Sequence, residues 1–395
     1  MPLHFFTSIT SNYIPKARVL ASSVKVHNTA SCFHLILADK IPKGFDVKNE
    51  PFDTLLTVED LDIENLDAWI FKHSVVELCT AIKGRSFLKL FEITDATKLV
   101  YLDPDIVVLS SLEELSKLMD FHDIVLVPHQ VEPDNEYQAI IDNEICSLKH
   151  GVFNLGFLAV TKSHEGLRFL TWWTNRLLDF CYDDIPNGLF TDQRWVDLAP
   201  CFFNVHILRD KSYNVATWNL THRHITKGAD GTLLIDDSPI KFFHFSGFDS
   251  GAQEIMLKKY APPDSPLFEL RDWYINKLES AGQNDYGSLS CCYEFYSNGE
   301  YIGLEERRLY RSRLDLMKAF PRPAQVTDDG DCYYWWYRKY GKQEPMGSFE
   351  LMTDGERLLF NLRKTWLWKL GRRVWMSNGI LRRLLRRTFL KTGTK

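Results

Sequence analysis

The sequence predicts an α/β fold, with a mainly parallel sheet flanked by helices, a C-terminal accessory region and a basic amphipathic tail. Over residues 1–250, short apolar runs typical of buried strands alternate with stretches of helical periodicity. This alternation is typical of parallel sheets covered by helices. Polar clusters also recur where the apolar runs end, which is the edge at which open α/β sheets bind ligands.

The expected elements follow from that alternation. We expect strands over residues 3–9, 32–37, 99–109, 123–128, 151–160, 205–208 and 240–245. We expect helices over residues 17–26, 67–94, 112–119, 167–182 and 267–281. Residues 39–53 hold two prolines and one glycine and are expected to form a loop. Prolines at 262, 263 and 266 mark a change of pattern beyond residue 250, and residues 286–345 are dense in aromatic side chains.

The most informative stretch is residues 99–109, in which Asp103, Pro104 and Asp105 separate two apolar blocks. Pro104 favours an extended backbone at Asp103, and in an extended chain residues i and i+2 point the same way. The two carboxylates can then converge on one hard cation, Mn²⁺ or Mg²⁺, which proteins usually hold together with substrate phosphates. The alternative is that this triplet is only a turn between two elements, because Asp and Pro are common turn residues.

Composition narrows the class of protein. Hydrophobic residues at 45% and charged residues at 25% are ordinary globular values. The eight cysteines include no CxxC pair, so free thiols in a reducing compartment are expected. We see no basic and apolar leader and no run of 18 apolar residues, and we therefore expect neither secretion nor a membrane span.

Charge is unevenly distributed along the chain. Residues 357–395 contain twelve Lys and Arg and no acidic residue, whereas the rest of the chain has a formal charge of −17. Arginines at 382, 383, 386 and 387 share one helical face opposite leucines, a pattern that suits an anionic membrane surface. A helix docked on the acidic body is the alternative, and nucleic-acid binding is disfavoured by the charge of that body.

Six polar clusters lie in order along residues 1–250. They occupy 7–13 (TSITSNY), 103–105 (DPD), 154–156 (NLG), 191–193 (TDQ), 218–220 (WNL) and 243–247 (FHFSG). Together they resemble the GT-A glycosyltransferases, which have a Rossmann-like fold, and most closely the retaining, galactosyltransferase-like class, glycosyltransferase family 8. The signatures YLDPDI, GxxNLGF, FxDQxWVD, NxxxWN and FFHFSGF point to a bacterial surface-polysaccharide branch.

The resemblance implies roles for individual residues. Asp103, Asp105 and His244 would bind Mn²⁺ or Mg²⁺, and Gln193 and Asp192 would be catalytic, with Gln193 near the anomeric carbon. The implied nucleotide-binding residues are Ser8, Thr10, Asn12, Tyr13, Lys83 and Asp103, with Tyr13 stacking on the base. The implied donor-sugar residues are Asn154, Gly156, Asp192, Gln193, Trp218, Asn219 and Gly247. Each has a structural alternative: His244 could be a core histidine, Asp192 a helix cap, Asn154 and Asn219 turn residues, and Tyr13 a packing residue.

The chain departs from the family pattern at one place. The family often follows its histidine motif with a lysine-proline-tryptophan that grips the diphosphate, but here Phe248, Asp249 and Ser250 follow. The diphosphate contact must come from elsewhere, and Lys83 and Lys258 are the candidates.

These observations predict a metal-dependent glycosyltransferase that transfers a hexose from a nucleotide diphosphate sugar, a UDP-sugar in our expectation, to a surface-glycan or lipid-linked acceptor. We expect residues 1–250 to form the catalytic domain, 251–345 an accessory region and 346–395 a membrane-associating tail, on a cytoplasmic protein peripheral to the inner face of the membrane. The aromatics of 286–345 could pack against the catalytic domain or line an acceptor groove. The rivals are a non-catalytic binding module with a degenerate site and, less favoured, a phosphatase with an aspartate pair.

Overall fold

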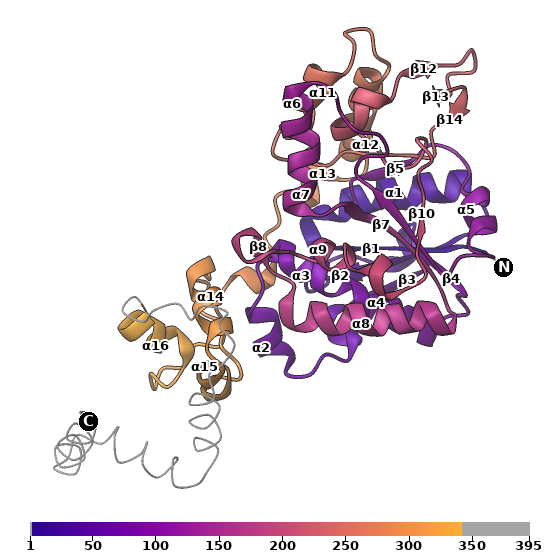
Figure 1. The fold of residues 1–395 in the computed structure, drawn as a ribbon. Helices are drawn as coiled ribbons and strands as arrows, with labels where there is room; N and C mark the ends of the chain where they lie inside the picture. Colours follow the sequence, from indigo (N-terminus) through magenta and orange to yellow (C-terminus); the bar gives the residue numbers. More distant parts are fainter. Residues whose placement is uncertain (1, 342–395) are drawn as a thin grey trace, which may run out of the picture. The chain divides into compact units, whose positions relative to one another are not determined.

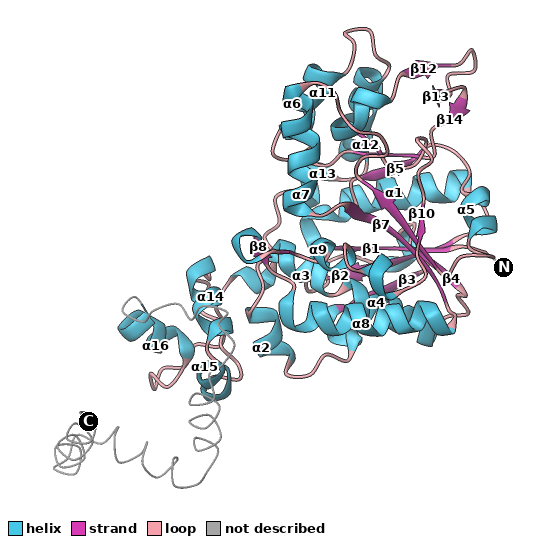
Figure 2. Cartoon of the chain, viewed as in Figure 1, coloured by secondary structure: helices cyan, strands magenta, loops and turns pink. Residues whose placement is uncertain are grey.

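The computed structural model describes residues 2–341, so the tail predicted at 346–395 lies outside the described residues (Figure 1, Figure 2). The strands are β1 (His4–Ile9), β2 (Cys32–Leu37), β3 (Thr54–Thr57), β4 (Lys98–Leu102), β5 (Ile106–Val108), β6 (Ile124–Pro128), β7 (Phe153–Thr161), β8 (Asp183–Asp184), β9 (Leu189–Phe190), β10 (His206–Ile207), β11 (Val215–Ala216), β12 (Ile225–Lys227), β13 (Leu233–Ile235), β14 (Ser238–Pro239) and β15 (Phe242–His244).

The α-helices are α1 (Ile14–His27), α2 (Leu66–Phe71), α3 (Val75–Ala81), α4 (Lys83–Ile93), α5 (Glu113–Leu118), α6 (Tyr137–Ala139), α7 (Cys146–His150), α8 (His164–Phe180), α9 (Gln193–Val196), α10 (Ala199–Phe202), α11 (Ala252–Tyr260), α12 (Leu267–Ser280), α13 (Gln283–Tyr286), α14 (Leu304–Ser312), α15 (Leu314–Ala319) and α16 (Tyr333–Tyr340). Short 3-10 or π-helical segments are η1 (Ser11–Tyr13), η2 (Val47–Asn49), η3 (Val58–Leu61), η4 (Ile140–Ile145), η5 (Ile185–Asn187), η6 (Thr217–His222) and η7 (Cys292–Glu294).

The central sheet has seven strands in the order β10-β6-β7-β4-β1-β2-β3. Strand β7 runs antiparallel to both its neighbours, and the other pairings are parallel. The α/β fold with a mainly parallel sheet is therefore confirmed. The carboxyl ends of β1, β2 and β4 share one edge, where the start of β7 also lies, and this edge carries the site.

Alternation along the strands divides the core into two layers. In β1, Phe5 packs with α1 on one face of the sheet, whereas Phe6 packs with α4 and α8 on the other. In β4 the pair Val100 and Tyr101 divides in the same way. Successive side chains of a strand point to opposite faces, so a strand of continuous apolar residues is buried on both sides. Figure 2 shows α1 on one side of the sheet and α4 and α8 on the other.

A second sheet, in the order β11-β15-β5, continues from the carboxyl end of β4. Residues 103–105 carry the chain from β4 into β5, and Ile106 N donates to Asp103 O at 3.0 Å, which closes a turn. The predicted buried strand therefore ends at Leu102, with the two carboxylates just beyond its end as expected, but the expectation of an extended backbone through residues 103–105 is wrong. The turn alternative is correct for the backbone, because pairing with the antiparallel β15 draws β5 out of the plane of the central sheet.

The predicted helix over residues 67–94 is also wrong as one element, because the chain forms α2, α3 and α4 in succession. Ser74 starts α3 with a reciprocal cap: Glu77 N donates to Ser74 Oγ at 3.4 Å, and Ser74 N donates to the Glu77 carboxylate at 2.7 Å. A serine followed three residues later by glutamate is a known helix start, so the sequence held this signal. Strand β3 follows the predicted loop at 39–53 and has no counterpart among the expected strands.

The aromatic accessory residues pack against α2. Tyr333 meets Phe71 at 5.3 Å between ring centroids, and Tyr334 belongs to the same buried cluster. Arg311 pairs with the buried Glu77 carboxylate at 3.1 Å. The boundaries at residues 250 and 345 stay predictions. Within residues 2–341, no helix combines the length and hydropathy needed to cross a bilayer.

Candidate active site

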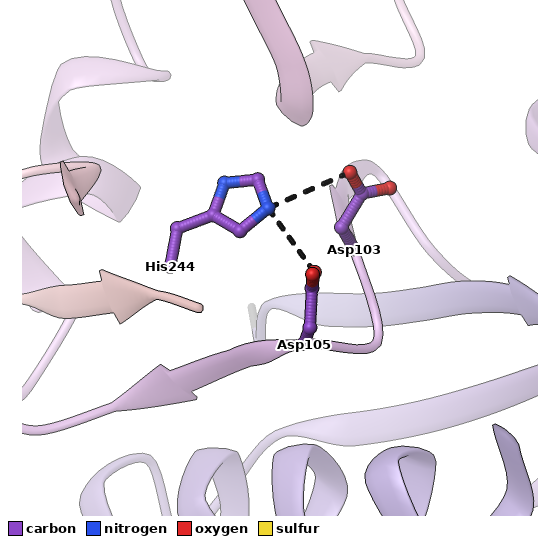
Figure 3. Close-up of side chains that lie close together, drawn as sticks. All are labelled: Asp103, Asp105 and His244. Carbon is purple, nitrogen blue, oxygen red and sulfur yellow. Dashed lines mark ion pairs between the residues drawn. The ribbon is translucent and has the colours of Figure 1, made fainter. Parts of the chain in front are cut away.

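Asp103, Asp105 and His244 converge at the carboxyl edge of β4 (Figure 3). His244 Nε2 lies 3.1 Å from Asp105 Oδ1 and 3.8 Å from Asp103 Oδ2, and one ligand atom from each residue lies within 4.8 Å of the others. His244 is the last residue of β15 and pairs in register with Ile106, while Phe245 N donates to Asp105 O at 2.8 Å. Strand pairing therefore brings a residue 139 positions downstream of Asp105 to the metal-ligand pair.

Gly156 forms one wall of this triad. A Cβ on Gly156 would lie 2.5 Å from His244 Cε1 and 2.9 Å from Asp103 Oδ2, so no side chain fits there. Asp103 N also donates to Gly156 O at 2.8 Å. The glycine is required by close approach rather than by backbone conformation.

The His244 ring is oriented from behind by Asn214. Asn214 Oδ1 lies 3.3 Å from His244 Nδ1, so the Nδ1 proton has an acceptor and Nε2 faces the two carboxylates. Trp218 packs edge-on against the same ring, with centroids 5.2 Å apart. A histidine with an oriented Nε2 beside two carboxylate oxygens is a suitable donor set for Mn²⁺, Mg²⁺ or a similar divalent cation.

Lys83 contacts the triad through Asp103 and is almost fully buried. Its ammonium is 2.9 Å from Asp192 Oδ2 and 3.4 Å from Asp103 Oδ1, and it donates to Leu155 O at 3.0 Å. The Tyr101 hydroxyl donates to Asp103 Oδ1 at 2.6 Å. Asp192 immediately precedes α9, but its side chain caps no backbone N–H, so it acts here as the counter-ion of Lys83.

Burial and the neighbouring charges act in opposite directions on the pKa values of these groups. Burial opposes the charge of Lys83, but Asp103 and Asp192 outweigh it and hold the Lys83 pKa well above its ordinary value. Burial would raise the pKa of Asp105, yet His244 brings it below the usual range. Burial would also lower the pKa of His244, but Asp105 raises it. Burial raises the pKa of Asp192 above its ordinary value despite Lys83. A divalent cation would displace the His244 proton, because a ligand histidine must be neutral.

The amide of Gln193 is fully engaged with backbone. Gln193 Oε1 accepts from Leu155 N at 3.0 Å, and Nε2 donates to His150 O at 2.9 Å. It therefore fixes the start of β7 against the end of α7. Asn219 is similar, because its amide bonds only backbone groups of residues 129, 214 and 216. Gly247 has φ +75° in the turn between β15 and α11.

Asn154 is bound within the site. Its Oδ1 accepts from Gly156 N at 3.2 Å, and its Nδ2 donates to His129 Nε2 at 3.1 Å. His129 must then be neutral with its proton on Nδ1, which agrees with a pKa lowered by burial to about 4. His129 and Trp218 pack at 5.5 Å, so these residues form one connected wall beside the triad.

Residues 8–13 follow β1 at the same edge. Ser8 Oγ donates to Cys79 O at 2.8 Å, and Thr10 Oγ1 donates to Asn12 Oδ1 at 2.7 Å. The Tyr13 hydroxyl donates to Asp249 Oδ2, and the Lys16 ammonium lies 2.6 Å from the same oxygen. Lys258, the other candidate for the diphosphate, pairs instead with Glu254 on its own helix at 2.5 Å.

The sequence did not predict four residues of the site, which are Asn214, His129, Lys16 and Tyr101. Asn214 is the first residue of the NxxxWN signature and Tyr101 stands in YLDPDI, so the motifs held those two without giving them a role. No sequence signal marks His129 or Lys16, because their positions depend on packing between distant segments.

A mainly parallel sheet that carries a buried histidine and two partly buried aspartates at its carboxyl edge defines an α/β protein with a candidate site for a divalent cation and an anionic ligand. Residues 4–171 match the model of the family described as Glycosyl transferase family 8. The predicted resemblance to glycosyltransferase family 8 is therefore confirmed over residues 4–171. Asp192, Gln193, Trp218, Asn219, His244 and Gly247 lie beyond the matched segment.

Two curated proteins of Bacillus subtilis (strain 168) are similar to this chain, and both are described as uncharacterized. YfnD is 24% identical over 252 residues, which cover 62% of this chain and 78% of YfnD. YfnF is 25% identical over 198 residues, which cover 50% of this chain and 61% of YfnF.

Solved glycosyltransferases are also similar. The galactosyltransferase LgtC, solved with donor and acceptor sugar analogs, is 17% identical and has a TM-score of 0.37, with 73% of this chain and 98% of LgtC covered. GlyE of Streptococcus pneumoniae TIGR4 is 14% identical and has a TM-score of 0.37, with 75% of this chain and 66% of GlyE covered.

Proposed function

We propose that this protein is a metal-dependent hexosyltransferase that uses a nucleotide diphosphate sugar, a UDP-sugar in our expectation, and acts with retention. The acceptor would be a surface glycan or a lipid-linked oligosaccharide. The observation that carries the proposal is the convergence of Asp103, Asp105 and His244 beside Gly156, in a chain whose residues 4–171 match glycosyltransferase family 8.

Each residue of the triad would have a chemical task. A divalent cation bound there would neutralise the charge that develops on the leaving nucleoside diphosphate. Asp103 and Asp105 would hold it with ionised oxygens, and His244 would present Nε2 while Asn214 retains the Nδ1 proton. Gly156 leaves the space that the ligands need. Preorganised charge of this kind commonly contributes more to the rate of group transfer than any other single effect.

The environment of Asp192 supports retention by attack from the leaving-group face. In that mechanism the acceptor hydroxyl attacks on the side from which the diphosphate departs, and a phosphate oxygen takes its proton. A double displacement would need a free carboxylate nucleophile, but Asp192 is buried and paired with Lys83 at 2.9 Å. Gln193 would act near the anomeric carbon by fixing backbone, since both ends of its amide are already bonded. The anomeric configuration of the product, measured by NMR, tests retention against inversion.

The first experiment is a donor screen on the full chain with Mn²⁺ and UDP-, GDP- and dTDP-sugars. We expect one donor to release nucleoside diphosphate, and EDTA to abolish that release. Asp105→Asn should lose the activity. The exposed carboxylate of Asp230 lies in the turn between β12 and β13, so Asp230→Asn provides a matched control that should retain it.

Binding measurements separate the remaining outcomes. A non-catalytic module would bind a metal-nucleotide complex but release no product with any acceptor extract. Residues 245–250, which follow His244, contain no lysine, whereas the family often has its diphosphate lysine after the histidine, and this is the observation that favours that second candidate. If no nucleotide sugar binds even with Mn²⁺, both interpretations of the site are wrong.

We further propose that residues 346–395 hold the enzyme at an anionic membrane surface, where a lipid-linked acceptor would be presented. The support is the charge of residues 357–395, with twelve basic and no acidic side chains. Each basic residue near such a surface contributes on the order of 1 kcal/mol.

A further inference from the structure

Lys16 is a buried lysine with one carboxylate partner. Its side chain is 5% exposed, and its ammonium lies 2.6 Å from Asp249 Oδ2, whose own side chain is 53% exposed. The ammonium also lies over the Tyr13 ring, 4.2 Å from the centroid. An almost completely buried ammonium that depends on a half-exposed carboxylate is an unusual arrangement, because buried charges normally have several fixed partners.

The position of this ion pair links it to the metal-ligand triad. Lys16 is in the first turn of α1, directly after residues 8–13 at the carboxyl end of β1. Asp249 is in the turn that follows His244, and this turn is bounded by Gly247 and Gly251, both with positive φ. The charge of Lys16 acts on Asp105, which it helps to keep ionised.

Lys83, the other buried lysine at the site, already has several fixed partners. Lys83 bonds Asp192, Asp103 and Leu155 O, so moving its ammonium would leave two carboxylates without a cation. Among the described residues, the carboxylate that Lys16 would leave is that of Asp249, which can turn to solvent. Lys258 is 66% exposed and paired on its own helix. Of these three lysines, Lys16 is therefore the one that can change partner at low cost.

We propose that Lys16 binds the diphosphate of the nucleotide donor and that Asp249 is its exchangeable counter-ion in the ligand-free protein. This inference rests on the proposed function. On donor binding, the ammonium moves from the carboxylate to a phosphate oxygen, and the 247–251 turn is released from α1. No covalent bond changes in this exchange. Lys16 thus supplies the cationic contact that residues 245–250 lack.

This exchange predicts that removing Lys16 and removing Asp249 change the affinity for the diphosphate in opposite directions, although the two residues form one ion pair. Removing the ammonium weakens diphosphate binding. Removing the carboxylate strengthens it, since no contact must be broken and a buried ammonium is left to attract an anion. A purely structural ion pair would behave differently, because losing either partner would disturb the same loop in the same direction.

The test is calorimetric titration of the full chain with UDP, GDP and dTDP in saturating Mn²⁺, and with the matching nucleosides. For the diphosphate that binds, Lys16→Met should raise Kd at least about tenfold, as expected for loss of a charge-assisted contact. Asp249→Asn should lower the same Kd by about threefold or more. Neither variant should change nucleoside binding. Lys25→Met is the control, since Lys25 is on the same helix and pairs with Asp53 at the surface.

A variant that conserves the charge keeps the result decisive. Lys16→Arg, which keeps the charge, should restore most of the affinity if Lys16→Met folds poorly. If Asp249→Asn weakens diphosphate binding, or if diphosphate and nucleoside affinities fall together, Lys16 has only a structural role and the proposal is overturned. Wild-type binding with no effect of Lys16→Met overturns this inference alone, whereas no wild-type binding of any nucleoside diphosphate overturns the proposed function with it.

Discussion

Asp103 and Gly156 face each other across the junction of β4 and β7, where Asp103 N donates to Gly156 O at 2.8 Å. The same glycine leaves the space occupied by Asp103 Oδ2, which would lie 2.9 Å from any Cβ at position 156. The pairing of β4 with β7 therefore fixes the position of the turn that carries Asp103 and also leaves the space that the Asp103 carboxylate occupies.

Gly156→Ala should disable the metal site. The added methyl would lie 2.5 Å from His244 Cε1, and neither the His244 ring nor the Asp103 carboxylate can move without breaking its other bonds. We expect Mn²⁺ affinity, measured by titration, to fall roughly 100-fold, because ligand displacement of this size removes a coordinating atom. Gly303→Ala is the control, since a Cβ there meets only Glu306 at 3.8 Å. Unchanged Mn²⁺ affinity would place the metal elsewhere.

Asn214 should affect the metal through His244. Its backbone has φ +50°, so Asn214→Gly removes the acceptor of the Nδ1 proton without straining the chain. Mn²⁺ affinity should fall roughly 10- to 100-fold, which is the usual effect of losing such an orienting bond. Asn65→Gly, at an exposed residue with the same φ, is the matched control. Equal affinities for both variants would show that the His244 ring is held by packing alone.

The pair Lys83–Asp192 should show strong energetic coupling. Lys83→Met leaves Asp192, which is 3% exposed, without its cation and should lower the free energy of unfolding by about 3 kcal/mol or more. Lys83→Met combined with Asp192→Asn should recover much of that loss, because no buried charge remains at position 192. Urea denaturation of the four proteins in this cycle gives the coupling energy. Additive losses would mean that the two side chains do not stabilise each other.

Acid should destabilise the central sheet through His34. Burial, with a contribution from His4, lowers its pKa from 6.5 to about 4. The unfolded chain therefore binds more protons between these values, and stability falls as the pH drops from about 6.5 to 4. The loss attributable to this residue approaches about 3 kcal/mol. In the His34→Gln variant, the denaturation midpoint should depend less on pH over that range. If the variant keeps the pH dependence of the wild type, other groups cause the loss of stability.

The basic tail should control membrane binding. We expect full-length protein to sediment with vesicles of anionic phosphatidylglycerol and not with neutral phosphatidylcholine. Replacing the four arginines at 382, 383, 386 and 387 with Gln should weaken that binding by roughly 100-fold or more, given the contribution of each charge. Replacing the exposed lysines at 48, 117, 227 and 258 with Gln changes net charge equally and should have little effect. Equal losses in both variants would indicate a non-specific charge effect.

Local sequence patterns were sufficient for most of the framework. The apolar runs of β1, β2, β6 and β7 and the amphipathic pattern of α8 predicted those elements to within a few residues. They succeed because a doubly buried strand needs continuous apolar residues, and a covering helix needs an apolar stripe. The ordered motifs also predicted the family and named the three residues of the triad before any contact was known.

Tertiary structure alone decided how these residues meet. The sequence placed Asp103 and Asp105 on an extended strand, but they converge because β15 pairs with β5 and the intervening chain turns. The sequence left Asp192 as a possible nucleophile or helix cap, whereas in the structure Asp192 is buried and forms an ion pair with Lys83. The sequence could not predict the ion pair between Lys16 and Asp249, because these residues are 233 positions apart. Composition and periodicity report which face of an element is buried, but ion pairs between distant segments depend on the registers and crossings that fix where those segments meet.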